Sequence, residues 1–294
     1  MSSLPTYTGA TRPSSPSAGD AIYLSDVNRL AVYDGDISEW RTFNSDGLVY
    51  NAAAPNELHY ANGIYDSSSA SYYINTQPKA HYDASLINGY DTAGNPAHSG
   101  VVSSWGDRSG NSNNLSQSNA TNQPLFDSSS SNLNSKPSVV FDGSNDFLNL
   151  TDSITLTADF SMLVALKNVD ANKAVAFGHA VTYTNVPWHR HINGSDYVFA
   201  ANSGAITDPS NASVIAMTRA SNSVKLYQNG GTPALTTTSS GTGTITVFGD
   251  SSLQHHNGEI AEAILFDSMI SLTDLNTIHS YFANKYGFTT STIS

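Results

Sequence analysis

Oxygen-bearing side chains gather in one short stretch of the sequence that could bind a cation. Asp142, Asn145 and Asp146 flank Gly143 between two apolar runs, and Glu262 lies far along the chain in another apolar run. Carboxylate and amide oxygens are the ligands that Ca²⁺ takes in proteins, but a turn needs the same residue types for its backbone. Two interpretations stay open: a structural calcium held by Asp142, Asn145, Asp146 and Glu262, or a turn together with a structural hydrogen-bond network around Glu262. No cofactor is expected to be required.

Histidines form a second group of side chains that could bind a ligand or a metal ion. His189 and His191 would share one face of an extended strand, His255 and His256 are adjacent, and Trp188 precedes the first pair. These five residues could line a sugar-binding rim or hold a metal ion. The alternative is that they are loop residues with ordinary hydrogen-bonding duties, since no carboxylate accompanies them at a metal-ligand spacing.

The best acidic strand argues against a glycan-cleaving enzyme. A pair of catalytic carboxylates has to face the same cleft, which in a strand requires an even spacing. Glu259 and Glu262 are three residues apart and would point to opposite faces, with Glu262 beside Ile260, Ile264 and Phe266. We therefore expect no catalytic residues and no enzymatic activity.

The composition limits the other functions. Of the 294 residues 12% are charged, and 12 basic against 24 acidic side chains give a formal charge of -12, which disfavours binding to nucleic acid phosphates. The chain has no cysteine and no apolar run long enough for a membrane helix. Its amino terminus lacks a basic segment followed by an apolar one, so we expect no Sec-dependent export and no membrane insertion.

The elements that must position these residues are mostly short strands. Alternating or apolar runs bounded by Gly, Asn, Asp and Ser indicate many strands, which is typical of a two-sheet sandwich. Asn229-Gly230 predicts a two-residue hairpin turn. A single helix is expected near the end, beginning after Ser271 or Thr273 and ending at Gly287. The strands are expected at 138–141, 147–150, 160–167, 174–178, 197–201, 213–219, 224–227, 244–248 and 259–266.

The beginning of the chain has a different character. Residues 1–45 combine a Ser/Pro-rich arm with three short alternating runs that predict a small β-meander, and 46–80 read as an extended linker. The meander has too few apolar residues to stand alone. The predicted domain of strands covers 81–294.

Three stretches together resemble the laminin-G-like, concanavalin A-like jelly-roll family. Val102–Asn111 with Lys136–Leu148 is similar to the family pattern W-x-D-x-S-G-N followed by K-P-x-V-x-F-D-G-x-x-D-x-L. Val224–Gly230 is similar to V-x-L-Y-x-N-G, and Gly258–Asp267 with the terminal Lys285–Gly287 is similar to G-x-I-A-E and K-Y-G. The resemblance implies an all-β, two-sheet antiparallel jelly roll with a C-terminal helix, and recognition of carbohydrate or protein as its usual activity.

A shorter resemblance concerns the first 45 residues. Ser17–Asp20, then Asn28–Gly35 and Trp40, resemble short modules of phage tail and virion proteins. The two resemblances imply a phage virion structural protein, a tail fibre or capsid-decoration component, located on the particle surface. Its arm would bind other virion proteins, its jelly roll would adhere to a host glycan, and it would form a homo-oligomer. The alternatives are a bacterial surface adhesin or carbohydrate-binding module and, third, a glycan-active hydrolase.

Overall fold

The chain divides into two compact units, Met1–Asn75 and Thr76–Ser294. In the computed structural model the described residues are 6–7, 15–17, 21–24, 29–34, 39–43, 49–50, 58–60, 72–74, 76–89, 92–157, 159–168, 174–178, 189–192, 195–198, 201–202, 212–238, 242–251 and 254–294. Within the described helices, none is long and apolar enough to cross a membrane.

Short strands make up the first unit. A five-stranded sheet has the order β1-β2-β3-β4-β5, in which β1 and β2 are parallel, and β6 pairs in parallel with β7. The antiparallel run from β2 to β4 corresponds to the expected meander, and β5 to β7 lie where the sequence suggested a linker. The strands are β1 (Thr6–Tyr7), β2 (Ala21–Leu24), β3 (Arg29–Asp34), β4 (Glu39–Phe43), β5 (Val49–Tyr50), β6 (Leu58–Tyr60) and β7 (Tyr72–Ile74).

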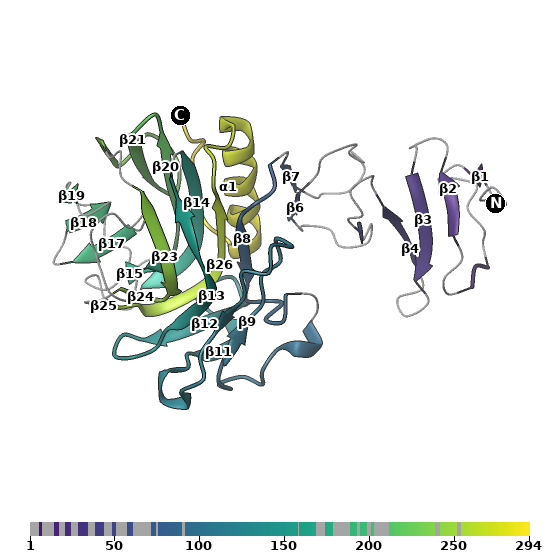
Figure 1. The fold of residues 1–294 in the computed structure, drawn as a ribbon, viewed down its shortest axis with the longest axis horizontal. Coiled ribbons are helices and arrows are strands. Elements are labelled where there is room, and N and C mark those ends of the chain that lie inside the picture. Colours follow the sequence, from purple (N-terminus) through teal and green to yellow (C-terminus); the bar gives the residue numbers. More distant parts are fainter. Residues whose placement is uncertain are drawn as a thin grey trace. The chain divides into compact units, whose positions relative to one another are not determined.

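The second unit is a sandwich whose larger sheet has eight strands (Figure 1). Seven strands follow the order β11-β12-β26-β14-β20-β21-β22, and β8 pairs with β26 next to β12. These strands are β8 (Ala80–Asp83), β11 (Leu125–Ser130), β12 (Lys136–Asp142), β14 (Phe160–Asn168), β20 (Ser213–Ala220), β21 (Ser223–Gln228), β22 (Leu235–Thr238) and β26 (Asn257–Phe266).

A five-stranded antiparallel sheet in the order β16-β23-β13-β10-β9 forms the other layer. Two smaller sheets, β15-β17-β18-β19 and β24-β25, complete the described strands. The bounds are β9 (Ser104–Trp105), β10 (Leu115–Ser116), β13 (Leu148–Leu156), β15 (Ala174–Val175), β16 (Phe177–Gly178), β17 (His189–Ile192), β18 (Ser195–Val198), β19 (Ala201–Asn202), β23 (Gly243–Phe248), β24 (Asp250–Ser251) and β25 (Gln254–His255), with 3-10 turns η2 (Thr92–Gly94) and η3 (Ala120–Asn122).

The core lies between these two sheets. Phe248 is its aromatic centre, with ring centroids 5.5 Å from Tyr82, 5.6 Å from Trp105 and 5.2 Å from Phe177. All four side chains are at most 2% exposed. Buried rings packed edge to face account for much of the energy of such a core, so the sandwich interior holds the second unit together.

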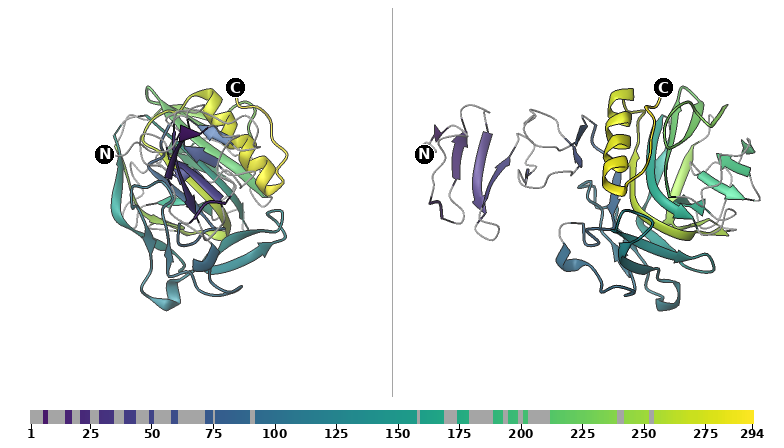
Figure 2. Two further views of the ribbon diagram at one scale, coloured as in Figure 1. Left: turned by 90° about the vertical axis from the view of Figure 1, so that its right-hand side faces the viewer. Right: turned by 180° about the vertical axis from the view of Figure 1, so that it is seen from behind.

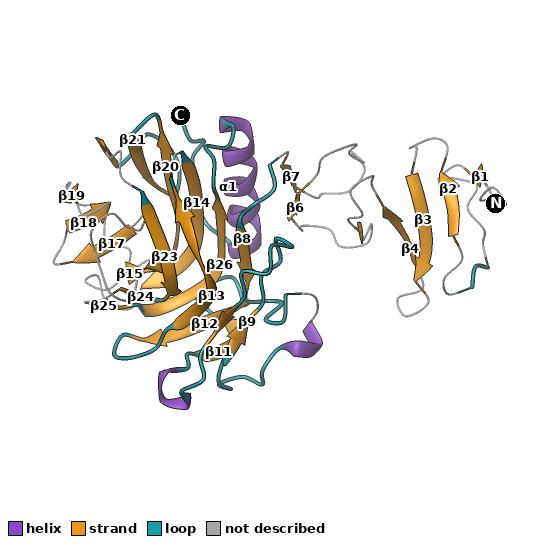
Figure 3. Ribbon diagram, in the orientation of Figure 1, coloured by secondary structure: helices purple, strands orange, loops and turns teal. Residues whose placement is uncertain are grey.

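One helix covers the other face of the larger sheet (Figure 2, Figure 3). We call the face toward the smaller sheet inner and the face under the helix outer. Helix α1 (Leu272–Tyr286) is capped by the side chain of Ser271 and ends at Gly287, which is left-handed with φ of 73°. Both ends were predicted from these residue types. The prediction of an all-β, two-sheet antiparallel sandwich with a C-terminal helix is confirmed.

Two local predictions differ from the structure. Asn229 and Gly230 do have positive φ, but β22 begins only at Leu235, so the connection is a six-residue loop rather than a two-residue turn. The serine-rich composition of residues 127–132 predicts an exposed loop, whereas β11 extends to Ser130 and pairs with β12 through an irregular register.

Replacing Gly230 by alanine is expected to destabilise the protein more than replacing Gly110 by alanine. The two glycines have similar positive φ, 78° and 85°, so each substitution carries a similar backbone cost of about 1 kcal/mol. A Cβ at Gly230 would lie 1.8 Å from the Ser291 carbonyl oxygen, whereas a Cβ at Gly110 meets nothing within 4 Å. We expect an additional loss of about 1–3 kcal/mol for Gly230→Ala. Denaturant titration of both variants checks this, and equal losses would contradict the close contact.

Candidate functional site

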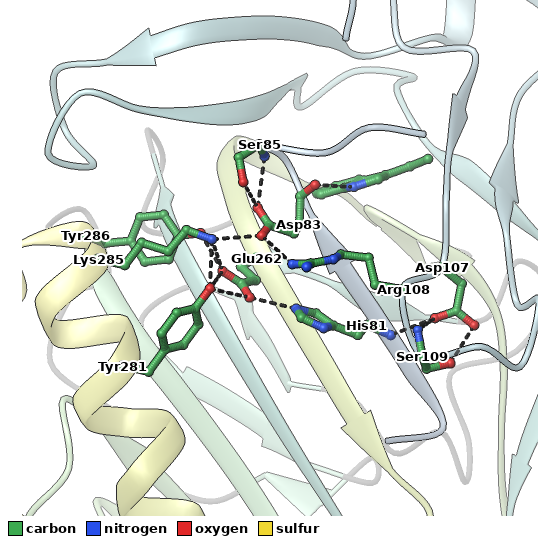
Figure 4. Close-up of polar contacts among 11 residues, drawn as sticks. His81, Asp83, Ser85, Asp107, Arg108, Ser109, Glu262, Tyr281, Lys285 and Tyr286 are labelled. Carbon is green, nitrogen blue, oxygen red and sulfur yellow. Dashed lines mark hydrogen bonds and ion pairs between the residues drawn. The ribbon is translucent and has the colours of Figure 1, made fainter. Parts of the chain in front are cut away.

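A buried cluster of ionisable side chains lies on the outer face of the larger sheet, under α1 (Figure 4). His81 and Asp83 alternate along β8 and therefore share a face, and Asp83 pairs directly with Glu262 of β26. Their exposed fractions are 1%, 2% and 0%. Lys285 and Tyr281 reach the same place from the last turns of α1. We call these residues, together with Arg108 and Tyr286, the Lys285 cluster.

A β-bulge places Glu262 in this cluster. Consecutive residues of β14 pair with Glu262 and Ile260, so Ala261 has no partner on β14. The extra residue shifts the alternation by one. Ile260 therefore joins Ala263 in the inner core, and Glu259 lies on the same outer face as Glu262. The predictions that the two glutamates face opposite sides, and that Ile260 lies beside Glu262, are wrong for this reason.

Glu262 is surrounded by donors. Its carboxylate accepts hydrogen bonds from the Lys285 ammonium at 2.7 Å, the Tyr286 hydroxyl at 2.7 Å and the Tyr281 hydroxyl at 3.0 Å. The His81 Nε2 atom lies 2.6 Å from the other oxygen. A fully buried carboxylate needs such partners because its desolvation is otherwise too costly, and the structural network expected for Glu262 as the alternative to calcium is the arrangement found.

The ammonium of Lys285 links the two carboxylates. Its Nζ lies 2.8 Å from Asp83 Oδ2 and 2.7 Å from Glu262 Oε2, and Arg108 approaches Asp83 at 2.9 Å. Two carboxylates thus face two permanent cations. Burial by itself would raise the pKa of Asp83, but Lys285 and Arg108 hold it well below its usual value. Burial and Asp83 act to raise the pKa of Glu262, which Lys285 and His81 lower overall.

Another carboxylate, that of Asp107, fixes the loop that carries Arg108. Asp107 accepts hydrogen bonds from the backbone N–H groups of His81, Ser109 and Asn113 at 2.8 to 2.9 Å and from the Ser109 hydroxyl at 2.7 Å. The Trp105 indole donates to the Asp83 carbonyl at 3.2 Å. Residues 105–111, the W-G-D-R-S-G-N stretch, therefore hold β8 in place and position Arg108 next to Asp83.

The cluster has the ligand types of a metal site but contains its own cation. Ligand atoms of His81, Asp83 and Glu262 lie within 4.8 Å of one another, and the Lys285 ammonium contacts both carboxylates. Because Glu262 is fully buried, it cannot reach a substrate in this arrangement. The chemistry that the cluster performs is charge compensation, which attaches α1 to the sheet.

The cluster makes stability depend on pH in a defined direction. Asp83 and Glu262 have pKa values lowered from 3.8 and 4.5, so their stabilising effect is present above these values and is lost as the pH falls. Burial acts to lower the pKa of Lys285, but the two carboxylates raise it above 10.5 overall, so its effect is lost as the pH rises through the raised value. We expect the free energy of unfolding to fall steeply below about pH 4 and above about pH 10.5. Denaturant unfolding across this range checks the prediction, and stability that rises with acid below pH 4 would contradict it.

The predicted calcium residues divide between two places. Asp142 Oδ1 accepts backbone hydrogen bonds from Ser144, Asn145 and Asp146 at 2.8, 3.1 and 3.3 Å, which forms the expected turn. Asp146 Oδ2 accepts one from the Asp142 N–H at 3.0 Å. Glu262 lies instead in the Lys285 cluster, five residues along β26 from the partner of Asp142. The three predicted residues of the turn, Asp142, Asn145 and Asp146, carry five side-chain oxygens, whereas Ca²⁺ takes six to eight oxygen ligands.

The predicted histidines are also divided. His255 lies close enough to the turn to act on both carboxyl groups: burial would raise the pKa of Asp142, but backbone N–H groups and, more weakly, His255 lower it overall, whereas burial raises the pKa of Asp146 overall despite His255. His256 is buried, with its ring 5.5 Å from that of Phe141. His189 and His191 lie on β17, which belongs to another small sheet, and Trp188 falls outside the described residues.

Sequence reasoning missed most of the Lys285 cluster. His81 and Asp83 lie at the boundary of the predicted linker, and Lys285 was noted only within a K-Y-G motif. The signal that could have found them is the pair of polar residues at a spacing of two in Ala80–Asp83, which is typical of a strand with one polar face.

Comparison with known proteins gives similarities of fold. No family model and no curated protein matches the sequence. An arabinofuranosidase solved in complex with arabinofuranosyl-α-1,2-xylobiose matches over 63% of this chain and 51% of its own, with 10% identity and a TM-score of 0.47. Domain 4 of an extracellular arabinanase from Geobacillus stearothermophilus, in complex with arabinotriose, matches over 71% and 98%, with 13% identity and a TM-score of 0.42.

A third similar structure is the heptameric SAP-like pentraxin from Limulus polyphemus, which matches over 53% of this chain and 87% of its own, with 13% identity and a TM-score of 0.37. The chain spans about half the length of the arabinofuranosidase. At these identities the likeness concerns the sandwich fold, which is shared with glycan-binding proteins and glycoside hydrolases.

These comparisons correct two predictions from the sequence. The expected function, a phage virion structural protein, is contradicted, because the similar structures described above are an arabinofuranosidase, an arabinanase domain and a pentraxin, and none of these three is a virion protein. The expectation that the chain is not an enzyme is contradicted by the same structures, since glycoside hydrolases are among those that share the fold; at these identities they show the fold and not the activity. Its argument from Glu259 and Glu262 also failed physically, since the bulge places both carboxylates on one face.

Proposed function

We propose that the second unit is a lectin-like carbohydrate-binding module that holds a neutral glycan at one end of the sandwich. The binding rim would consist of Thr121, Asn122, Asp142, Asn145 and His255. In this proposal the resemblance to laminin-G-like domains extends to carbohydrate recognition. The Lys285 cluster would keep the scaffold rigid and take no part in contact with the ligand.

The observation that carries this proposal is the convergence of three segments that are far apart in sequence. The Asn145 amide donates to the Thr121 carbonyl at 2.6 Å and to the Asn122 side chain at 3.1 Å, which joins the two turns. His255 influences the pKa of Asp142 from β25. Asp142 and Thr121 are exposed, and Asn122, Asn145 and His255 are partly exposed.

The chemistry of this rim suits hydroxyl groups. Each sugar hydroxyl can both donate and accept a hydrogen bond, so its binding site needs acceptors and donors side by side. Asp142 Oδ1 is used by the turn, whereas its Oδ2 atom makes no hydrogen bond with any described residue and can accept from a ligand. In this proposal the Asn122 amide and the His255 imidazole supply donors, while the Asn145 amide joins the two turns. The formal charge of -12 disfavours a strongly anionic glycan, so the proposal is for a neutral one.

A glycan array tests the proposal directly. We expect the full chain to bind one class of neutral oligosaccharide, with arabinotriose among the probes, and an Asp142→Asn, Asn145→Ala double variant to bind at least tenfold more weakly. An Asp152→Asn variant, which changes an exposed carboxylate of β13, serves as the control and should bind like the unchanged protein. Loss of binding in the control, or unchanged binding in the double variant, would contradict the assigned rim.

Glycan hydrolysis is a second candidate, and we propose it because of one pair of carboxyl groups. Burial would raise the pKa of Asp142, but the three backbone N–H groups lower it, whereas burial and the charge of Asp142 raise the pKa of Asp146. Environments that separate two neighbouring pKa values are typical of an acid and base pair. Release of reducing sugar by the unchanged protein and its loss in Asp146→Asn would support hydrolysis. Binding without any release would exclude it.

Two further expectations from the sequence remain proposals. A structural calcium at the Asp142 turn predicts that glycan binding or thermal stability increases with added Ca²⁺ and falls in EDTA.

Homo-oligomerisation predicts a molecular mass by sedimentation equilibrium that is a multiple of 31.2 kDa. Both measurements use the full chain and do not depend on the identity of the glycan.

A further inference from the structure

The last seven residues bind back across the end of the fold. We call Phe288–Ser294 the C-terminal strap. The Ser291 N–H donates to the Asn229 carbonyl at 2.9 Å, and the Gly231 N–H donates to the Ser291 carbonyl at 3.3 Å. Ser294 donates to the Gly231 carbonyl at 3.1 Å. The strap is therefore attached to the loop between β21 and β22 through its backbone.

The strap is also attached to α1. The Ile293 N–H donates to the Asn276 side chain at 2.7 Å, and the Asn276 amide returns a hydrogen bond to the Ile293 carbonyl at 3.1 Å. The Ile293 side chain is 1% exposed. A small set of backbone bonds, the buried Ile293 side chain and the Phe288 ring, whose centroid lies 5.8 Å from that of Tyr286, thus hold the strap. Such a segment can open without global unfolding.

His279 of α1 lies beneath this contact. It is 2% exposed, and its Nε2 atom has no hydrogen-bond partner among the described residues. A Cβ built on Gly230 would lie 2.9 Å from His279 Cε1 and 1.8 Å from the Ser291 carbonyl oxygen. His279, Gly230 and Ser291 are therefore packed against one another, with no space for a hydrated imidazolium.

No nearby charged group stabilises a protonated His279. The outer face presents His81 and Asp83 from β8, Lys167 from β14, Lys225 and Tyr227 from β21 and Glu259 and Glu262 from β26, while β20 presents no titratable side chain there and the strap carries none. Asp274 and Lys285 belong to α1 itself. None of these groups contributes to the pKa shift of His279, which burial alone lowers to about 4.

We propose that the strap is an acid-released element: protonation of His279 opens the contact between Phe288–Ser294 and the Asn229–Gly231 loop and exposes this end of α1. The imidazolium is stable only when it reaches water. Gly230 lies beside the His279 ring, and the neighbouring Asn229 and Gly231 are hydrogen-bonded to the strap, so release of the strap loosens the contact over the ring. This proposal does not depend on glycan binding at the rim around Asp142.

The direction and size of the effect follow from linkage. In the closed state the pKa is about 4, and in an opened state it returns to about 6.5. The closed state is therefore fully favoured above pH 6.5 and becomes less so as the pH falls toward 4. The opening equilibrium should rise about tenfold for each pH unit in this window, roughly 300-fold in total.

Hydrogen exchange followed residue by residue on the full chain tests the proposal. We expect the protection factors of the Gly231, Ser291, Ile293 and Ser294 amides to fall about tenfold per pH unit between pH 6.5 and 4. The same amides should show no such fall in His279→Gln. The control variant His98→Gln, which changes a histidine whose side chain is 64% exposed, should behave like the unchanged protein.

Two outcomes would overturn the proposal. One is an equal fall in His279→Gln; the other is a parallel fall for amides of the central strand β14, which would mean global unfolding. If His279→Gln does not fold, NMR titration of the His279 ring in the unchanged protein decides the matter. A pKa of about 4 supports the proposal, and a pKa at the ordinary value of about 6.5 rejects it.

Discussion

Lys285→Met is expected to destabilise the protein by about 3–5 kcal/mol, because it removes one partner of a buried ion pair and leaves the other charged. The Lys285 ammonium contacts Asp83 and Glu262, which are 2% and 0% exposed. Without it, only Arg108 remains as a permanent cation in the cluster. Denaturant unfolding followed by tryptophan fluorescence measures the loss.

The control for this variant is Lys79→Met. Lys79 is 38% exposed in its side chain and lies 4.0 Å from Asp267, so its pair is solvent-screened and should be worth less than about 1 kcal/mol. If Lys285→Met and Lys79→Met cost the same, the Lys285 cluster does not compensate buried charge as described. A double variant with Glu262→Gln should lose less than the sum of the single variants, because the two residues share one interaction.

Asp107→Ala is expected to have an effect of similar size, about 3–5 kcal/mol. The Asp107 carboxylate accepts three backbone hydrogen bonds and one from a hydroxyl, and the residue is 7% exposed. Alanine would leave these donors buried without partners, each at a cost of about 1–3 kcal/mol before relaxation. Urea unfolding of the variant measures the loss.

The matched controls separate hydrogen bonding from charge. Asp107→Asn keeps one side-chain oxygen as an acceptor and should lose less than Asp107→Ala. Asp127→Ala removes a carboxylate that is 25% exposed and pairs only with the exposed His98 and the Ser129 backbone, so it should cost about 1 kcal/mol or less. A loss for Asp107→Ala no larger than that for Asp127→Ala would contradict the role of Asp107 in holding β8.

Local sequence rules predicted those parts of the fold that depend on neighbours in the chain. Ser271 and Gly287 marked the ends of α1, because a helix needs a side-chain acceptor at its start and a left-handed residue at its end. The central strand was predicted at 160–167 and is observed as β14, Phe160–Asn168. Its nine residues are nearly all buried, which is why they form a nearly continuous apolar run in the sequence. Together with the spacing of the resembling motifs, these elements led to the sandwich.

The candidate sites depended on contacts that a local pattern does not contain. Asp83 and Lys285 are separated by 202 positions, and only strand pairing brings β8 next to β26. A single residue with no partner on β14, Ala261, reversed the assignment of faces for Glu259 and Ile260. A bulge is set by tertiary packing against two neighbouring strands, so the alternating pattern alone gave the wrong face.

The proposed binding rim also depends on contacts that the sequence pattern alone does not contain. The Asp142 turn was expected from its residue types, and Asn145 and Asp146 were placed in it. Its meeting with Asn122 and His255 was not expected, because three separate loops converge there only after the sheets have paired.

The measurement that tests the central claim most directly is an NMR titration of the isotope-labelled full chain with the oligosaccharide that binds best on the array. The account predicts that the largest saturable shift changes occur at the amides of Asn122, Asn145 and His255, while those of Tyr281 and Lys285 stay unchanged. Saturable changes confined to other parts of the sandwich, or no saturable change with any array glycan, would contradict carbohydrate binding at this rim.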